Sequence, residues 1–286
     1  PIKRPYIWDF APSASVVRLC LQDGARVFLL EWKAASRDNV GAGLADYAGR
    51  FIGDALEMVL GATSGQKPIL VGHSLGGTFA AIFAASRPEA LRGLVLLGAP
   101  LCFEPRSTQF RDSVVAMASA SHPDTDIVPG SFLSQISAIA APSAFVWSRL
   151  ADARFGAEDP KILQMQGRIE RWSLDEAALS GRLVRDILRL LLEEDRFCHG
   201  TLQIGRGVVG PGNLRLPMLV VVNSADQVAP LASISRVLEA VDPAQLRVIR
   251  CPGEAGVGLQ HLAVLVGRSA HSVLWPEILS WLNSLP

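Results

Sequence analysis

The sequence predicts an α/β fold, in which a mostly parallel sheet carries helices on both faces and a mainly helical segment is inserted into it. Short, nearly continuous apolar runs alternate with helical patterns, as is typical of parallel strands buried on both sides. One run, 69–71, breaks into Gly72-His73-Ser74-Leu75-Gly76 and passes directly into a helix of small residues. The alternation then lapses between about 99 and 216. A sheet interrupted by one insertion explains all three observations.

Each expected element rests on its own pattern. The candidate strands are the apolar runs 6–8, 26–32, 69–71, 93–98, 218–222 and 246–250. The candidate helices are 13–22 with Ser13 as N-cap, 43–60 with an apolar face, 78–85, and a terminal helix beginning near His271. Inside the insertion, 131–133, 144–147 and 183–192 also favour helices.

Length and composition allow one large domain or two small ones. The chain has 286 residues, 49% of them hydrophobic, which is enough for a full core. The strands on either side of the insertion look incomplete alone, so we expect residues 1–100 and 214–286 to form the core and 101–213 an inserted cap. The alternative is a second independent domain.

Charge and cysteine usage exclude several classes of partner and cofactor. The chain has 27 basic and 27 acidic residues, so it has no net positive charge that would attract nucleic acid or an anionic membrane. Cys20, Cys102, Cys198 and Cys251 are scattered without metal-type spacing, and we expect reduced thiols and no cofactor or metal. No transmembrane stretch or signal-peptide core is found, which predicts a cytoplasmic protein. The sequence begins at Pro1, and what precedes it is left open.

The Gly-x-Ser-x-Gly run is typical of a nucleophile elbow, with Ser74 as the nucleophile. In that element a strand turns sharply into a helix, the serine adopts a strained conformation, and side chains in place of the flanking glycines would clash. The alternative is an ordinary glycine-rich turn. The strand before Ser74 and the helix after it favour the elbow.

A serine nucleophile requires a base, and the base requires a carboxylate to hold its tautomer. Asp226 follows the strand 218–222, where the acid of the order Ser, acid, His is expected. The alternative role for Asp226 is a helix cap. His261 follows the strand 246–250 through a glycine-rich loop and is favoured as the base over His271.

The remaining polar candidates have weaker patterns. His73 is expected to line the pocket or pack against it, and His122 and His199 are expected to be ordinary histidines of the insertion. For the oxyanion, the backbone N–H of Leu75 is the first expected donor. A second donor is expected from the early loop, at the backbone of Trp8 or Asp9. A Trp8 that only packs in the core and an Asp9 that is an ordinary loop residue are equally compatible with the pattern.

Taken together, these residues resemble the catalytic domain of polyhydroxyalkanoate synthases. The similar segments cover most of the chain: 4–12, 15–18, 24–32, 46–47, 128–130, 171–175 and 226–230. The terminal runs 267–270, 275–276 and 281–282 resemble the C-terminal pattern of synthase-related hydrolases. The resemblance implies an α/β-hydrolase fold, with Asp226 and His261 in the positions of the family's acid and base. Synthases of this type often carry a further N-terminal region.

One departure from that family changes the expected chemistry. The synthases use cysteine at the elbow, whereas this chain has Ser74. A serine ester needs general-base activation and is common where water completes the reaction, so we expect hydrolysis of an ester or thioester with an apolar or hydroxyacyl group. The alternatives are a synthase-like acyltransferase using serine and a non-catalytic granule-associated protein. The partner hypotheses are a small or oligomeric substrate, a homodimer, or polyester granules.

Overall fold

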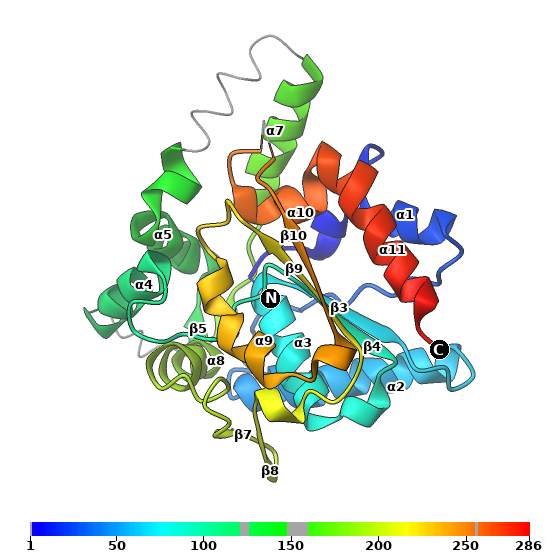
Figure 1. Ribbon diagram of the computed structural model, residues 1–286. Helices are drawn as coiled ribbons and strands as arrows, with labels where there is room; N and C mark the ends of the chain where they lie inside the picture. Colours follow the sequence, from blue (N-terminus) through cyan, green and yellow to red (C-terminus); the bar gives the residue numbers. More distant parts are fainter. Residues whose placement is uncertain (1, 121–125, 148–159, 255–256) are drawn as a thin grey trace.

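The centre of the molecule is a parallel sheet of four strands in the order β10-β9-β4-β3 (Figure 1). This computed structural model describes residues 2–120, 126–147, 160–254 and 257–286. The strands are β3 (Ile69–His73), β4 (Gly93–Leu97), β9 (Met218–Asn223) and β10 (Leu246–Cys251). All four lie in expected strands, which confirms the predicted α/β class.

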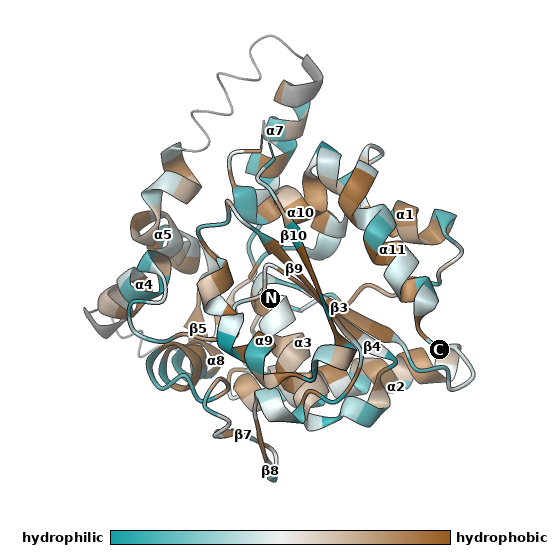
Figure 2. Cartoon of the chain, viewed as in Figure 1, coloured by the Kyte–Doolittle hydropathy of each residue, from teal (hydrophilic) through white to brown (hydrophobic). Residues whose placement is uncertain are grey.

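Two layers of helices cover the sheet, because alternate strand residues point to opposite faces. On β4, Leu94 and Leu96 belong to one core cluster, and Val95 and Leu97 to the other. The first layer contains α2 (Ile52–Ala62), α3 (Ser74–Ser86) and α9 (Ser235–Ala240). The second contains α1 (Val16–Gln22), α10 (Ala263–Val266) and α11 (Trp275–Ser284). Figure 2 shows that the hydrophobic residues concentrate on the central strands.

The segment between β4 and β9 is mainly helical, as expected. Its elements are α4 (Gln109–Ala120), β5 (Ile127–Val128), α5 (Gly130–Ala140), α7 (Pro160–Leu174), β6 (Leu179–Ser180), α8 (Gly181–Asp186), β7 (Leu202–Ile204) and β8 (Gly207–Val209). Leu183, Leu191 and Phe197 share the core cluster of α3. The boundaries 1–100, 101–213 and 214–286 stay a prediction.

Several connections form short 3₁₀ or π-helical turns. The π-helical turns are Asp46–Phe51, Ser143–Trp147, Ile187–Glu193 and Ala270–Leu274. The first of them continues into α2, so the expected helix 43–60 is present with a π-helical start at Asp46 and an end at Ala62. Within the described ranges, no helix has the length and apolar character needed to cross a membrane.

The N-terminal expectations need two corrections. Pro5–Trp8 is a 3₁₀ helix and not a strand, and it leads into β1 (Asp9–Ala11), which pairs with β2 (Ala14–Ser15). The cap of α1 is Ser15 and not Ser13, since the Ser15 hydroxyl accepts the N–H of Arg18 at 3.0 Å and donates to Asp9 at 2.6 Å. The β1–β2 pairing therefore decides where the helix begins.

The expected strand 26–32 is also wrong. The segment has no regular secondary structure and is not part of any sheet, and Phe28 and Leu29 are each 47% exposed. Among the described residues, the backbone of 26–34 makes no hydrogen bond. A strand exists only if a neighbour pairs with it, and here the sheet ends at β3.

Candidate active site

Ser74 lies where β3 turns into α3, in a left-handed backbone conformation with φ of 56°. That region is uncommon for any residue other than glycine and is maintained only when the surroundings require it. A Cβ on Gly72 would lie 2.5 Å from the Gly77 Cα, and a Cβ on Gly77 would lie 2.5 Å from the Ala99 Cβ. A Cβ on Gly76 would meet nothing within 4 Å. The close approach thus involves Gly72 and Gly77 and not the motif's second glycine.

This geometry gives a matched stability prediction. We expect Gly72→Ala and Gly77→Ala each to lower the free energy of unfolding by about 1–3 kcal/mol, because backbone must shift to admit the methyl group. We expect Gly76→Ala to be neutral or to stabilise by up to about 1 kcal/mol, since it removes flexibility from a helix. Thermal unfolding of the three variants measures the difference. Equal shifts at Gly72 and Gly76 would contradict the packing described.

Asp226 lies in the loop after β9 and is 3% exposed. One carboxylate oxygen accepts the N–H groups of Val228 at 2.8 Å and Ala229 at 3.1 Å, and the other accepts from His261 Nδ1 at 2.7 Å. Burial alone would raise the pKa of Asp226, but His261 and the two backbone donors outweigh it and hold the pKa below its usual range. The carboxylate is therefore ionised at neutral pH and orients the imidazole.

His261 has one engaged nitrogen and one without a partner. Its Nδ1 donates to Asp226, whereas Nε2 is buried and has no hydrogen-bond partner within the described part of the chain. Ser74 and His261 line the same cavity, which has a volume of about 1490 Å³ and mostly apolar walls. No hydrogen bond joins the Ser74 hydroxyl to Nε2 in this conformation.

His73 has a closer relation to the site than the sequence indicates. Its ring centroid lies 4.6 Å from that of His261, and its Nε2 donates to the His261 carbonyl oxygen at 2.9 Å. Burial, followed by the neighbouring His261, lowers the pKa of His73 to about 3. His73 thus stays neutral beside His261 and fixes the backbone that carries it.

Sequence reasoning missed two side-chain amides: Asn223 joins the acid loop to the histidine loop, and Gln260 stabilises the histidine loop internally. Asn223 Nδ2 donates to the Gln260 carbonyl oxygen at 2.8 Å. The Gln260 side chain accepts the Glu254 N–H at 2.8 Å and donates to the Glu254 carbonyl oxygen at 2.9 Å. An Asn at a strand end and a Gln beside a histidine are common, and only their proximity in space distinguishes them.

The other histidines lie elsewhere. The His271 Nε2 donates to the Leu265 carbonyl oxygen at 2.7 Å, and burial lowers the pKa of His271. His199 is exposed on the insertion, and His122 is outside the described residues.

The oxyanion candidates occupy the expected surroundings. Leu75 is the second residue of α3, and Trp8 ends the early 3₁₀ helix; both line the cavity. The Asp9 N–H donates to the Tyr6 carbonyl oxygen. The role of Trp8, the other expected donor of that loop, stays a prediction.

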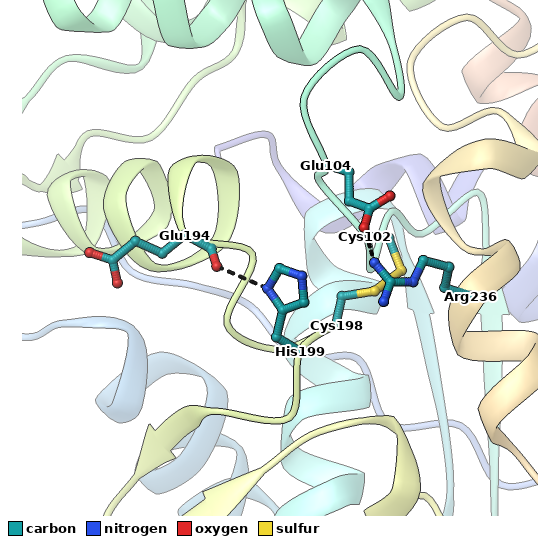
Figure 3. The surroundings of a disulfide bond; sticks show 6 residues. All are labelled: Cys102, Glu104, Glu194, Cys198, His199 and Arg236. Carbon is teal, nitrogen blue, oxygen red and sulfur yellow. Dashed lines mark hydrogen bonds and ion pairs between the residues drawn. A yellow bond between two sulfur atoms is a disulfide. The ribbon is translucent and has the colours of Figure 1, made fainter.

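The cysteine expectation is wrong for one pair. Cys102 and Cys198 form a disulfide (Figure 3), whereas Cys20 and Cys251 are free. Widely separated cysteines give no sequence signal for such a pair. The absence of a metal stays a prediction: within the described residues, Glu104, Asp195 and His199 could offer ligand atoms within 4.8 Å of one another. Glu104 is already paired with Arg236, so we assign no metal there.

Asp195 gives a pH-dependent stability prediction. The Asp195 side chain is 2% exposed, and neither of its carboxylate oxygens accepts a hydrogen bond of normal geometry from a described residue. Burial raises the pKa of Asp195 to about 6, although the Phe103 N–H, His199 and Arg111 each act to lower it. Because the folded pKa exceeds the unfolded value of about 3.9, stability falls as the pH rises from about 4 to 6 and stays lower above 6.

We therefore expect Asp195→Asn to raise the free energy of unfolding at pH 8 by on the order of 1–3 kcal/mol, with the gain shrinking toward pH 4. Denaturant unfolding across that pH range measures it. The exposed Asp54→Asn change is the control and should shift stability by less than about 0.5 kcal/mol at either pH. A gain that does not depend on pH would contradict the burial argument.

The sheet order, the elbow and the carboxylate–histidine pair at the strand ends define the α/β-hydrolase class. The sequence profile of the α/β hydrolase fold matches residues 7–255, and the chain belongs to that family. Solved structures agree on the fold. The monoacylglycerol lipase of Paleococcus ferrophilus superposes with a TM-score of 0.57 at 18% identity, covering 94% of this chain and 87% of that chain. An esterase of Exiguobacterium antarcticum gives 0.58 at 15% identity, covering 99% and 88%.

Among curated proteins, the chain is similar to poly(3-hydroxyalkanoate) polymerase subunits. It is 27% identical to that of Haloferax mediterranei over 98% of this chain and 56% of the relative. It is 22% identical to that of Allochromatium vinosum over 99% of this chain and 78% of the relative. The chain thus spans little more than half the length of the haloarchaeal protein. The predicted resemblance is confirmed, and the family and its relatives together support a hydrolase or an acyltransferase.

Proposed function

We propose that this protein is a serine hydrolase that cleaves an ester or thioester through an acyl-enzyme. The observation that carries the proposal is the state of the two His261 ring nitrogens. Asp226 holds Nδ1, and Nε2 has no hydrogen-bond partner among the described residues. His261 lines the same cavity as Ser74. A free Nε2 on an oriented imidazole is what a general base requires.

The proposed reaction has two steps. The Ser74 Oγ attacks the acyl carbon as His261 Nε2 takes the hydroxyl proton, and His261 then returns that proton to the leaving alcohol or thiol. Water attacks the acyl-enzyme with His261 again as base, releasing the acid. The Leu75 and Trp8 N–H groups are the proposed oxyanion donors. Asp226 stays ionised throughout and stabilises the imidazolium.

The cavity supports an apolar acyl group as substrate. Phe103 and Phe132 from the segment between β4 and β9 line it together with Ser74. Apolar walls with a few polar groups at one place are usual for a site that binds an acyl chain and orients its carbonyl. The polymerase relatives favour a hydroxyacyl ester, oligomer or coenzyme A thioester as the first compounds to test.

A second candidate is an acyltransferase in which a hydroxyl group replaces water in the second step. The similarity to polymerase subunits across nearly the whole chain favours it. The two proposals share the acylation step and differ only in the acceptor.

One experiment separates these functions from a non-catalytic protein. Labelling with a fluorophosphonate, mapped by peptide mass spectrometry, should modify Ser74. Incubation with 3-hydroxybutyryl coenzyme A should then release 3-hydroxybutyrate if the protein is a hydrolase, or oligomer if it is an acyltransferase. No labelling at all would refute both and favour a binding protein.

A further inference from the structure

Two side chains hold consecutive carbonyl groups of the histidine loop. The Nε2 of His73 donates to the His261 carbonyl oxygen at 2.9 Å, and the Nδ2 of Asn223 donates to the Gln260 carbonyl oxygen at 2.8 Å. A carbonyl oxygen can only accept, so each bond requires a side chain that carries a hydrogen at the bonding atom. We call these two bonds the histidine tethers.

The histidine tethers start at the ends of two different strands. His73 is the last residue of β3 and directly precedes Ser74, and Asn223 is the last residue of β9, in the strand that leads to Asp226. One tether therefore relates the backbone of His261 to the backbone of the proposed nucleophile. The other relates the histidine loop to the loop of the proposed acid.

The end of β4, which lies between β3 and β9, leaves no free space under the same pair. The residue that follows β4 is Gly98, with φ of 50°. A Cβ on Gly98 would lie 3.2 Å from a carboxylate oxygen of Asp226 and 3.5 Å from His261 Nδ1. The Asp226–His261 pair thus packs on the backbone at one strand end while the strands on both sides of it supply the tethers.

Both tethers have fixed donors. Asn223 is 1% exposed, and its Oδ1 accepts the Ala225 N–H at 3.0 Å, which turns Nδ2 toward the histidine loop. His73 stays neutral in any ordinary assay, because burial and then the neighbouring His261 lower its pKa to about 3. A neutral His73 can hold the His261 backbone without placing a second positive charge beside the imidazolium that forms during the reaction.

We propose that His73 and Asn223 are positioning residues, which set the place of His261 Nε2 relative to Ser74. This inference rests on the proposed function. Neither residue exchanges a proton with the substrate; both act through the backbone of Gln260 and His261. Because that backbone is held, the hydrogen bond from Ser74 to Nε2 forms by rotation of the two side chains and requires no movement of the histidine loop.

Two substitutions of His73 test its tether. His73→Phe keeps a ring beside His261 but removes the donor, whereas His73→Gln keeps an N–H donor on a side chain of similar reach. We expect His73→Phe to lower kcat for the ester or thioester by about 10- to 100-fold with KM changed by less than about threefold, since a small misplacement of a catalytic group has such an effect. His73→Gln should recover most of kcat. Equal kcat values for the two variants would overturn the proposal.

His271 provides the matched control. Its Nε2 also donates to a backbone carbonyl oxygen, that of Leu265, at 2.7 Å, and it is not among the described residues that line the cavity. His271→Phe should lower Tm, as His73→Phe should, but leave kcat within about twofold of the original protein, because the geometry of the site is unchanged. A fall in kcat as large as that of His73→Phe would overturn the proposal, since the loss of any such bond would then explain both.

Asn223→Ala tests the second tether independently and carries the test if His73→Phe does not fold. We expect the same pattern, a lower kcat with little change in KM. Proton NMR gives a measurement without substrate: the proton that His261 Nδ1 donates to Asp226 should give a low-field signal in the original protein and in His73→Gln. In His73→Phe and Asn223→Ala this signal should broaden through faster exchange with water. A sharp signal in both variants together with unchanged kcat would overturn the proposal.

The rate of fluorophosphonate labelling distinguishes this inference from the proposed function. If the original protein is not labelled at Ser74, the proposed function fails and the inference with it. If the original protein is labelled, we expect His73→Phe and Asn223→Ala to react at least about tenfold more slowly, because the label also requires the base. Labelling of both folded variants at the original rate would refute the positioning role alone and leave the hydrolase proposal intact.

Discussion

Replacing Ser74 by alanine is expected to lower kcat for ester or thioester cleavage by about 10⁴-fold or more, and to abolish fluorophosphonate labelling. The alanine side chain has no atom that can form the acyl-enzyme, so only binding and the oxyanion donors would act on the substrate. The residual reaction should therefore proceed without an acyl-enzyme. Mass spectrometry of the quenched reaction should find no acylated peptide that contains position 74.

The matched control is Ser137, another serine of the same cavity. Its hydroxyl donates to the Leu133 carbonyl oxygen at 3.0 Å within α5, so it has a local structural role. Ser137→Ala is expected to leave kcat within a few-fold of the original protein. If Ser74→Ala retained most of its activity, the proposed nucleophile would be wrong, whatever the behaviour of Ser137.

Asp226→Asn is expected to have the second large effect, with a fall in kcat of about 10⁴-fold and little change in KM. An amide can keep the shape of the loop, but it would donate to His261 Nδ1 and leave the proton on Nε2, the nitrogen that must accept from Ser74. Steady-state kinetics measure the split between kcat and KM. If kcat fell and KM rose by the same factor, the substitution would instead have disrupted the structure of the loop.

Acid unfolding provides a second measurement on the same variant. The folded-state pKa of Asp226 lies below its unfolded value of about 3.9, so the carboxylate stabilises the fold above about pH 4. That contribution is lost as the pH falls through the folded-state pKa. The stability difference between the original protein and Asp226→Asn should therefore narrow below pH 4, and a difference that widened there would contradict the assigned charge.

The parts of the fold that the sequence predicts well are those set by local pattern. The apolar runs at β3, β4, β9 and β10 are bounded by turn residues; β4 and β9 are buried throughout, β3 is mostly half-buried, and β10 has only Ile249 buried. The 3₁₀ helix at Pro5–Trp8 was not predictable from apolar content, because the fixed φ of Pro5 favours a helical start in so short a run.

Features that depend on distant partners could not be predicted. Residues 26–32 have the composition of a strand, but pairing requires a neighbour at the right place. In the site, Asn223 bonds a residue 37 positions later, and His73 contacts the backbone of His261, 188 positions away. The chemistry of Ser74 can be proposed from its motif, whereas the residues that position His261 become evident only in three dimensions.

The disulfide closes a loop of the chain that carries half of the Phe and Trp residues lining the cavity. Cys102 and Cys198 are 96 positions apart, and Phe110, Phe132 and Phe145, which line the cavity, lie between them. The disulfide holds the two ends of this segment together, and the four strands of the sheet lie outside it. In the proposed hydrolase, a substitution at one of these three phenylalanines would therefore change a wall of the acyl cavity without touching a residue of the sheet.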